Sequence, residues 1–185
     1  MTKGTPRIHP EVATLLVDAY RPCPGLETTC ASMSWAPSAG HIPRGFCGAL
    51  AGCKAVELVL VCAEPGDPHD SEEYDAFASP ADRMAAAFAW AFESLRHQRD
   101  RFHKNIRFIL DACYRDTRQL ESQLERVWIT ESVKCSAPRE GGYVAVGVAR
   151  ACRSRFLEPE LRLFPRALVV ALGRKASARL AGNPE

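Results

Sequence analysis

The chain has 185 residues, of which 46% are hydrophobic and 25% are charged, and its formal net charge is +2. These values suit one soluble globular domain, since domains commonly hold about 100–200 residues. No apolar run approaches the roughly 18 residues of a membrane span, and the amino terminus lacks the apolar core of a signal peptide. We therefore expect a monomeric, cytoplasmic protein with a single domain over residues 1–185 and no membrane partner.

The predicted elements alternate between helix and strand. An amphipathic helix is expected at 10–20, then an irregular cysteine-containing loop region at 21–56 and a buried strand at 58–61. Ser79-Pro80-Ala81-Asp82 is a typical helix start. The later expectations are a helix at 102–113 rather than a short strand at 106–110, a polar, exposed helix at 116–125, strands at 127–133 and 167–172, and a helix from 174.

This alternation favours parallel strand pairing, because parallel strands need long, usually helical, connections. The sequence therefore predicts an α/β fold, a three-layer α/β/α sandwich around a central, mainly parallel sheet. Glu64 follows the first strand directly, and Pro65 and Gly66 turn the backbone just beyond it. Ligands of open α/β sheets bind outside the carboxyl ends of the strands, so Glu64 is a candidate site residue as well as an ordinary loop acid.

Basic residues gather in the last third of the chain. Residues 1–125 hold 13 basic and 17 acidic side chains, whereas residues 126–185 hold 11 and 5. Nineteen of the 24 basic residues are arginine, whose guanidinium group suits two-point contact with phosphate. The pattern favours a nucleic-acid partner, and a high-GC coding bias is the alternative explanation.

Three segments in this order resemble the uracil-DNA glycosylase superfamily, most closely its iron–sulfur family 4 and 5 branch. They are VCAEPG at 61–66, VWITESVKCSAP at 127–138 and LVVALG at 168–173. The resemblance covers roughly residues 20–180. It implies a uracil-DNA-glycosylase-like fold and a DNA-binding hydrolase that cleaves N-glycosidic bonds of deaminated or damaged bases in base excision DNA repair.

The same resemblance implies a structural [4Fe-4S] cluster, a cofactor usually held by four thiolates. The matching positions are Cys23, Cys30, Cys135 and Cys152. Cys47 and Cys53 are rivals for the amino-terminal pair, and a structural zinc or buried free thiols are the alternatives to the cluster. Cys62 and Cys113 are expected in the core.

The resemblance also assigns the substrate site. Glu64 becomes the catalytic acid that faces the oxocarbenium-like sugar, although family 4 carries its acid one residue earlier, at Ala63. The turn of Pro65 and Gly66 would hold a carbonyl of the flipped base. Phe77 occupies the position of the family's stacking aromatic residue.

Phe77 has a rival in Tyr74, and core packing is an alternative for both. Glu131 replaces the asparagine with which the family reads uracil. An ionised glutamate only accepts hydrogen bonds, so Glu131 either favours a base that presents amino or N–H groups or must be protonated to mimic the amide, and uracil specificity does not follow.

The family's last motif, a His-Pro-Ser-like segment, has no counterpart before Glu185, and His41 and His69 are the histidines that could reach the cleft. Two further functions therefore stay open. One is a catalytically impaired, nucleic-acid-binding relative. The other is a metal-dependent nucleotide or phosphate-ester hydrolase that uses Glu64, Asp67 and Asp70.

Overall fold

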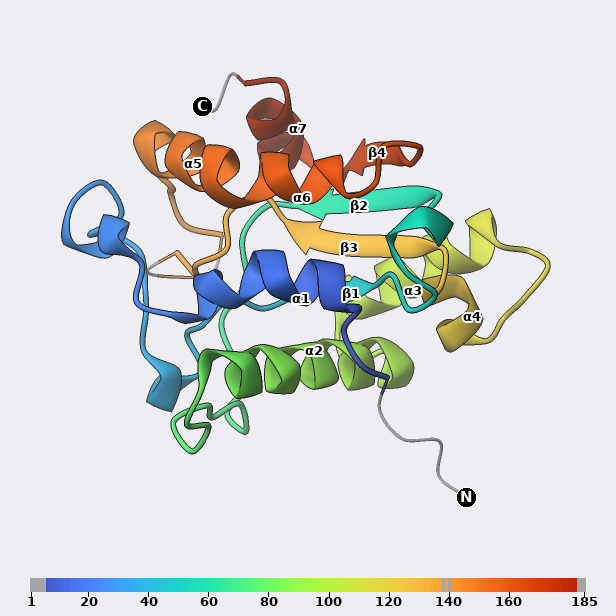
Figure 1. The fold of residues 1–185 in the computed structure, drawn as a ribbon, viewed down its shortest axis with the longest axis horizontal. Helices are drawn as coiled ribbons and strands as arrows, with labels where there is room; N and C mark the ends of the chain where they lie inside the picture. Colours follow the sequence, from blue (N-terminus) through green and yellow to red (C-terminus); the bar gives the residue numbers. More distant parts are fainter. Residues whose placement is uncertain (1–5, 138, 140, 183–185) are drawn as a thin grey trace.

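The computed structural model describes residues 6–137, 139 and 141–182 as a mixed α/β fold around one four-stranded sheet (Figure 1). The strands are β1 (Cys47–Gly48), β2 (Leu58–Cys62), β3 (Val127–Glu131) and β4 (Leu168–Ala171). The α-helices are α1 (Pro10–Leu16), α2 (Pro80–His97), α3 (Arg101–Cys113), α4 (Leu120–Leu124), α5 (Val146–Cys152), α6 (Glu158–Arg162) and α7 (Arg174–Leu180). A π-helical segment, Arg153–Leu157, joins α5 to α6.

The sheet is open and mostly parallel, as the alternating pattern predicted. Its order is β1-β3-β2-β4, in which β2 pairs in parallel with β3 and β4, and β1 pairs antiparallel with β3. Every residue of β2 and β3 is buried, whereas Leu168 on the edge strand β4 is 67% exposed. The two central strands therefore form the middle of the core.

The helix starts follow the local sequence signals. At the start of α2 the Ser79 hydroxyl accepts a hydrogen bond from the Asp82 amide at 3.1 Å, with Pro80 in the first helical position. At the start of α3 the Asp100 carboxylate accepts one from the His103 amide at 2.9 Å. The predicted helices beginning at residue 80 and spanning 102–113 are thus confirmed, and the predicted helix at 10–20 is α1 followed by a 3₁₀ turn, Val17–Tyr20.

Two expectations about local structure held only in part. Within 116–125 only the short helix α4 forms, and Leu120, Gln123 and Leu124 on it are buried, whereas Asp116, Arg118, Gln119 and Glu125 are exposed as expected. The Gln123 amide donates to the Asp111 carboxylate at 2.8 Å, which satisfies a polar group that the sequence pattern placed in solvent.

The second expectation was an irregular loop region at 21–56. This region contains the short strand β1. Gly48 has a φ of +119°, and a β-carbon there would lie 2.0 Å from the Val127 carbonyl oxygen. A strand of two residues that depends on one glycine leaves no periodic pattern to detect.

Helices cover the sheet and close its edges. Figure 1 shows α2 beside the β1 edge and α7 beside the β4 edge, and α1 contacts both α2 and α6. Trp128 on β3 is fully buried, and its ring centroid lies 5.8 Å from those of Phe46 and Phe164. Within the described residues, no helix combines the length and the apolar character that crossing a bilayer requires.

Candidate active site and cysteine pocket

The carboxyl ends of the three parallel strands meet at one edge of the sheet. Cys62 on β2 pairs with Glu131 on β3, and the ladder continues where the Ser132 amide donates to the Cys62 carbonyl at 2.9 Å. On the other side of β2, the Leu172 amide donates to the Val61 carbonyl at 2.8 Å. The carboxyl ends of β2, β3 and β4 therefore lie side by side, where open α/β sheets bind their ligands.

Glu64 lies just beyond the end of β2, and its carboxylate is held by two cations from α7. Lys175 Nζ lies 2.7 Å from one carboxylate oxygen, and Arg179 Nη1 lies 2.6 Å from the other. The Glu64 side chain is only 5% exposed. The candidate acid is therefore part of a closed ion-pair cluster that joins the β2 end to α7.

Neither cation was a candidate in the sequence analysis. Both residues fall on one face of α7 because they are four positions apart. Arg179 also donates to the Ala63 carbonyl at 2.9 Å and to the Ser132 hydroxyl at 3.1 Å, so it bridges the ends of β2 and β3. Two cationic side chains four positions apart, just after the strand expected at 167–172, were the sequence signal that could have identified them.

Glu131 ends β3 with its carboxyl group inside the protein. The residue is 4% exposed, and its Oε2 atom has no hydrogen-bond partner. Burial, together with the neighbouring Glu64 carboxylate, raises the pKa of Glu131 to about 8, against the opposing effects of Lys134, Arg44 and Arg179. At neutral pH this side chain is therefore mainly a neutral acid, with one donor and one acceptor.

The loop that precedes β1 covers Glu131. Gly45 has a φ of +80°, and a β-carbon there would lie 2.6 Å from the Glu131 Oε1 atom. The adjacent Arg44, which is buried, donates to the Gly66 carbonyl, to the Ser136 hydroxyl at 3.1 Å and to Glu72 at 3.2 Å. Arg44 therefore fastens this loop to the turns that follow β2 and β3.

The two candidate stacking aromatics differ in access. Tyr74 is fully buried, and its hydroxyl donates to Glu72 at 3.0 Å. Phe77 is half-buried, and its ring lies 6.3 Å from the Tyr74 ring. Tyr74 is therefore a core residue, and Phe77 keeps a partly open face.

The two candidate histidines differ in exposure and in hydrogen bonding. His69 is exposed, and its Nδ1 atom lies 2.7 Å from the Ser71 hydroxyl. Burial, together with the positive charge of Arg44, lowers the pKa of His41, whose Nδ1 atom is buried without a partner. His41 is therefore neutral at neutral pH. It lies in the same loop as Arg44 and Gly45, which covers Glu131, whereas His69 is exposed.

The acidic trio of the alternative metal-dependent hydrolase is not assembled. Within the part of the chain that the structure describes, one group of three histidine, cysteine or acidic residues brings its ligand atoms within 4.8 Å of one another, and it does not include Glu64, Asp67 or Asp70. Both oxygens of Glu64 already pair with α7 side chains, so a metal ion would have to displace Lys175 or Arg179 to bind there.

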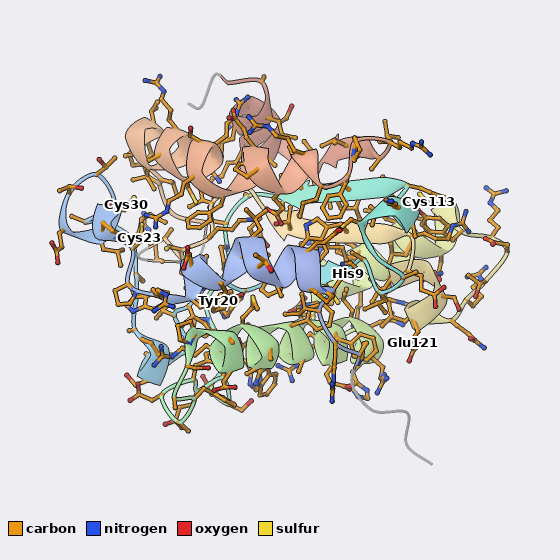
Figure 2. The ribbon with its side chains drawn as sticks, viewed as in Figure 1. His9, Tyr20, Cys23, Cys30, Cys113 and Glu121 are labelled. Carbon is orange, nitrogen blue, oxygen red and sulfur yellow. The ribbon has the colours of Figure 1, made fainter. Side chains whose placement is uncertain are left out.

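Four cysteines line one pocket of about 120 Å³. They come from the loop after α1, from the segment after β3 and from α5, and they are Cys23, Cys30, Cys135 and Cys152. Met33, Val133 and Phe156 give the pocket an apolar wall. Figure 2 shows Cys23 and Cys30 close together, and a β-carbon at Gly25 would lie 3.5 and 3.1 Å from their sulfurs. Residues more than a hundred positions apart thus converge on one site.

Burial and the neighbouring thiols raise the pKa of Cys135 to about 12 and that of Cys152 to about 11, the latter against the opposing effect of Lys134. A metal that binds here would therefore displace the thiol protons. Two donors point at the sulfurs, because the Lys134 amide lies 3.2 Å from Cys152 and the Arg155 guanidinium lies 3.3 Å from Cys23. Donors of this kind stabilise thiolates that bind a metal.

The other cysteines lie elsewhere. Cys47 is buried in β1 and Cys53 lies beside His9, so neither rival joins the four-cysteine pocket. Cys62 is buried, as expected. The expectation that Cys113 is a core residue was wrong, since it is exposed at the end of α3 and the next residue, Tyr114, takes the buried position (Figure 2).

A buried ion pair lies beneath this edge of the sheet. The Lys134 ammonium group lies 2.5 Å from the Glu160 carboxylate and also donates to the Thr130 hydroxyl at 2.7 Å. The other Glu160 oxygen accepts from the Trp128 indole at 2.7 Å. Because every charged atom is paired, this network ties α6 to β3 without an unsatisfied charge.

Comparisons of the chain with protein-family models, with curated proteins and with solved structures found no match.

Proposed function

We propose that this protein is a DNA glycosylase that removes deaminated or damaged bases, of the uracil type, in base excision repair. The observation that carries the proposal is the buried carboxyl group of Glu131 at the end of β3, whose Oε2 atom has no hydrogen-bond partner and whose pKa is raised to about 8. A buried polar atom without a partner costs free energy, and such atoms are typical of sites that a ligand completes.

A neutral carboxylic acid presents the same hydrogen-bonding edge as an amide. Its O–H group donates and its carbonyl oxygen accepts, so protonated Glu131 can pair with a base edge as the asparagine of the resembled family does. Protonated Glu131 is therefore compatible with uracil-type substrates, whereas an ionised glutamate, which only accepts hydrogen bonds, would not be. Gly45 covers the carboxyl group, so entry of a flipped base requires that its loop move away from Glu131.

Glu64 is the proposed catalytic acid. When the bond between the base and C1′ breaks, its electron pair leaves with the base, so positive charge builds on the sugar and negative charge on the base. Water then adds to C1′, and the proton that it loses passes through solvent to the base anion. The Glu64 carboxylate would stabilise the sugar cation. Lys175, which is 41% exposed and lies 2.7 Å from Glu64, would offset the charge on the base anion, a role that the family gives to its final histidine.

The four-cysteine pocket supports an iron–sulfur cofactor over a single zinc ion. Tetrahedral zinc holds its sulfur ligands roughly 3.8 Å apart, given zinc–sulfur bonds of about 2.3 Å. No three of the four described sulfurs lie within 4.8 Å of one another. The wider spacing suits a [4Fe-4S] cluster, which would act as a structural clasp between Cys23, Cys30 and the segments after β3.

Basic residues would bind the DNA backbone. Arg150, which is exposed, and Arg153, which is half-buried, lie next to the buried Arg179 of the proposed site. Arginine suits two-point contact with phosphate oxygens. A three-layer sandwich of the glycosylase type is the architecture that this function implies.

A second candidate function is DNA binding without catalysis. It is favoured by the two ion pairs that occupy Glu64 and by the 5% exposure of its side chain. In such a relative the Glu64 cluster would serve only to hold α7 against the sheet.

Single-turnover assays separate the two functions. Iron-loaded protein is mixed with oligonucleotides that carry uracil, hypoxanthine or xanthine, and alkali then cleaves the strand wherever a base is lost. The glycosylase proposal predicts cleavage of at least one substrate and its loss in Glu64→Gln, with salt-sensitive DNA binding retained. Binding without cleavage of any substrate, by folded and iron-loaded wild-type protein, would leave only the second candidate.

A further inference from the structure

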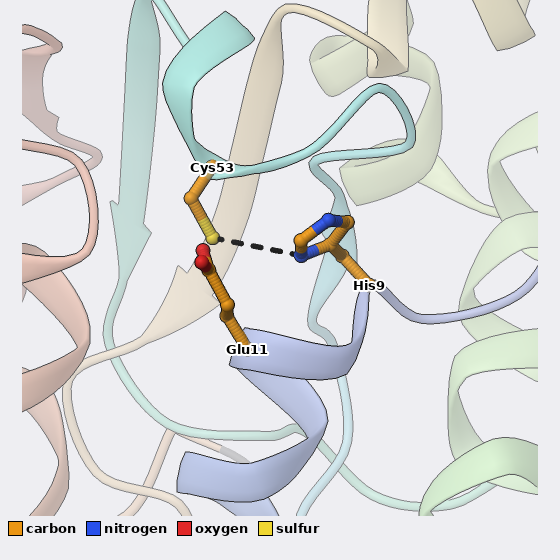
Figure 3. Close-up of side chains that lie close together, drawn as sticks. All are labelled: His9, Glu11 and Cys53. Atoms are coloured by element: carbon orange, nitrogen blue, oxygen red, sulfur yellow. Dashed lines mark hydrogen bonds between the residues drawn. The ribbon is translucent and has the colours of Figure 1, made fainter.

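Three metal-binding side chains gather at the opposite end of α1 from the cysteine pocket. His9 and Glu11 flank Pro10 at the start of α1, and Cys53 opens the 3₁₀ turn Cys53–Ala55 just before β2. Their ligand atoms all lie within 4.8 Å of one another, and the Cys53 sulfur lies 4.0 Å from His9 Nδ1. Figure 3 shows the three side chains converging from the two segments.

The backbone around the cluster is shaped to bring these side chains together. His9 is the N-cap of α1 and has an extended backbone, with φ −62° and ψ 137°, which directs its ring away from the helix that begins at Pro10. Gly52 has a φ of +100°, and a β-carbon there would lie 3.1 Å from His9 Nε2. The turn before Cys53 therefore needs glycine, both for its conformation and for the space that the imidazole occupies.

The types of ligand atom in this cluster and their spacing point to zinc. A thiolate, an imidazole nitrogen and a carboxylate oxygen are its usual ligands, whereas magnesium and calcium prefer oxygen alone. Zinc bonds of about 2.0–2.3 Å in a tetrahedron place the ligand atoms about 3.3–3.8 Å apart. The 4.0 Å between Cys53 and His9 is close to that spacing, so small side-chain rotations complete the geometry.

We propose that His9, Glu11 and Cys53 bind one zinc ion, with water in the fourth position. Cys53 is buried, His9 is half-buried and Glu11 is exposed, so the three ligands leave an open side for that water. The Cys53 thiol proton would pass to solvent when the sulfur binds the metal.

The ion would fasten α1 to the turn that leads into β2. His9 and Cys53 are 44 positions apart, and the chain between them carries Cys23 and Cys30. A metal clip that closes a long loop restricts the unfolded chain and so stabilises the folded one. The zinc would therefore close the loop that carries two residues of the cysteine pocket. This inference is independent of the proposed function.

Metal analysis of the full chain tests the site. Wild type, Cys53→Ser, His9→Ala and the control Cys113→Ser are exposed to zinc, dialysed against metal-free buffer and analysed for zinc and iron per chain. Wild type and Cys113→Ser should retain one zinc more than Cys53→Ser and His9→Ala, with equal iron in all four. Equal zinc in all four proteins would overturn the proposal. A fifth protein, Cys135→Ser, is analysed in the same way, and loss of zinc in that variant alone would also overturn it.

Two further measurements test the site if Cys53→Ser fails to fold. They are the spectrum of bound cobalt and the zinc affinity after substitution of Glu11, the exposed ligand. Cobalt bound at the site should give a thiolate charge-transfer band in wild type and Cys113→Ser that is absent in His9→Ala. Glu11→Gln, which changes an exposed side chain, should keep the wild-type circular dichroism and weaken zinc binding by at least about tenfold. Unchanged zinc affinity and unchanged cobalt spectra in both folded variants would show that the cluster binds no metal.

Discussion

The Glu64 carboxylate and the Arg179 guanidinium form a nearly buried ion pair, with 2.6 Å between the charged atoms and with side chains only 5% and 6% exposed. Because Arg179 also donates to the carbonyl of Ala63 and to Ser132, it holds the ends of two strands and α7 in one arrangement. The proposed catalytic acid is thus also a structural residue.

Glu64→Gln should lower the free energy of unfolding by about 3–5 kcal/mol, because it leaves the buried Arg179 without its carboxylate. Lys175→Met should cost less than about 1 kcal/mol, since Lys175 is 41% exposed and water screens its ion pair. Urea unfolding of the three proteins measures both values. If Glu64→Gln unfolds at the wild-type urea concentration, the ion pair has no structural role.

Glu131 should make the protein less stable as the pH rises. Its pKa is about 8 in the folded protein and close to 4.5 when unfolded, so the folded state binds the proton more tightly. The stabilisation is fully present below pH 4.5 and is lost as the pH rises to about 8, at about 1.4 kcal/mol per unit.

Glu131→Gln should remove this dependence, since glutamine keeps the shape of the neutral acid and does not titrate. Urea unfolding at intervals from pH 5 to pH 9 compares the variant with wild type and with the exposed control Glu73→Gln. The control should keep the wild-type slope. A variant slope equal to that of wild type would mean that Glu131 is already ionised at pH 5.

Glu131 should also control base selection. With the acid protonated, below about pH 8, uracil-type edges are favoured, whereas the ionised form accepts only and favours bases that present N–H or amino groups. Glu131→Asn should therefore cleave uracil substrates at a rate that does not fall above pH 8. Single-turnover rates from pH 6 to pH 9 measure this, and a parallel decline in both proteins would contradict it.

Cys135→Ser should lose iron, because it removes a sulfur that faces the four-cysteine pocket. Cys62→Ser is the matched control, since Cys62 is buried on β2 and does not line that pocket. Iron and acid-labile sulfide per chain, measured after anaerobic purification, give the comparison. Equal iron in the two variants would exclude Cys135 as a ligand.

Glu160→Gln should destabilise the protein by about 3–5 kcal/mol, because Lys134 would keep a buried charge without its partner. Since Glu160 also accepts from the Trp128 indole, tryptophan fluorescence in the folded state should change as well. A variant with wild-type stability and fluorescence would show that the network contributes little.

The sequence by itself determined the main helices and strands and their order, although β1 left no pattern and α4 is shorter than expected. Ser79 and Pro80 set the start of α2, the apolar runs set β2 and β3, and the alternation of strand and helix set the parallel pairing. It also placed Glu64 just after one parallel strand and Glu131 near the end of another, and parallel strands bring their carboxyl ends to one edge. These features depend on short-range patterns, which can be read residue by residue.

Only the tertiary structure decided what those side chains contact. Arg179 reaches Glu64 and Cys23 faces Cys135 across more than a hundred residues, and no periodic pattern records such distances. Burial, which sets the protonation of Glu131, depends on a loop that Gly45 brings over it. Charge state and pairing are properties of the packed environment, so they follow from the fold and not from the local sequence.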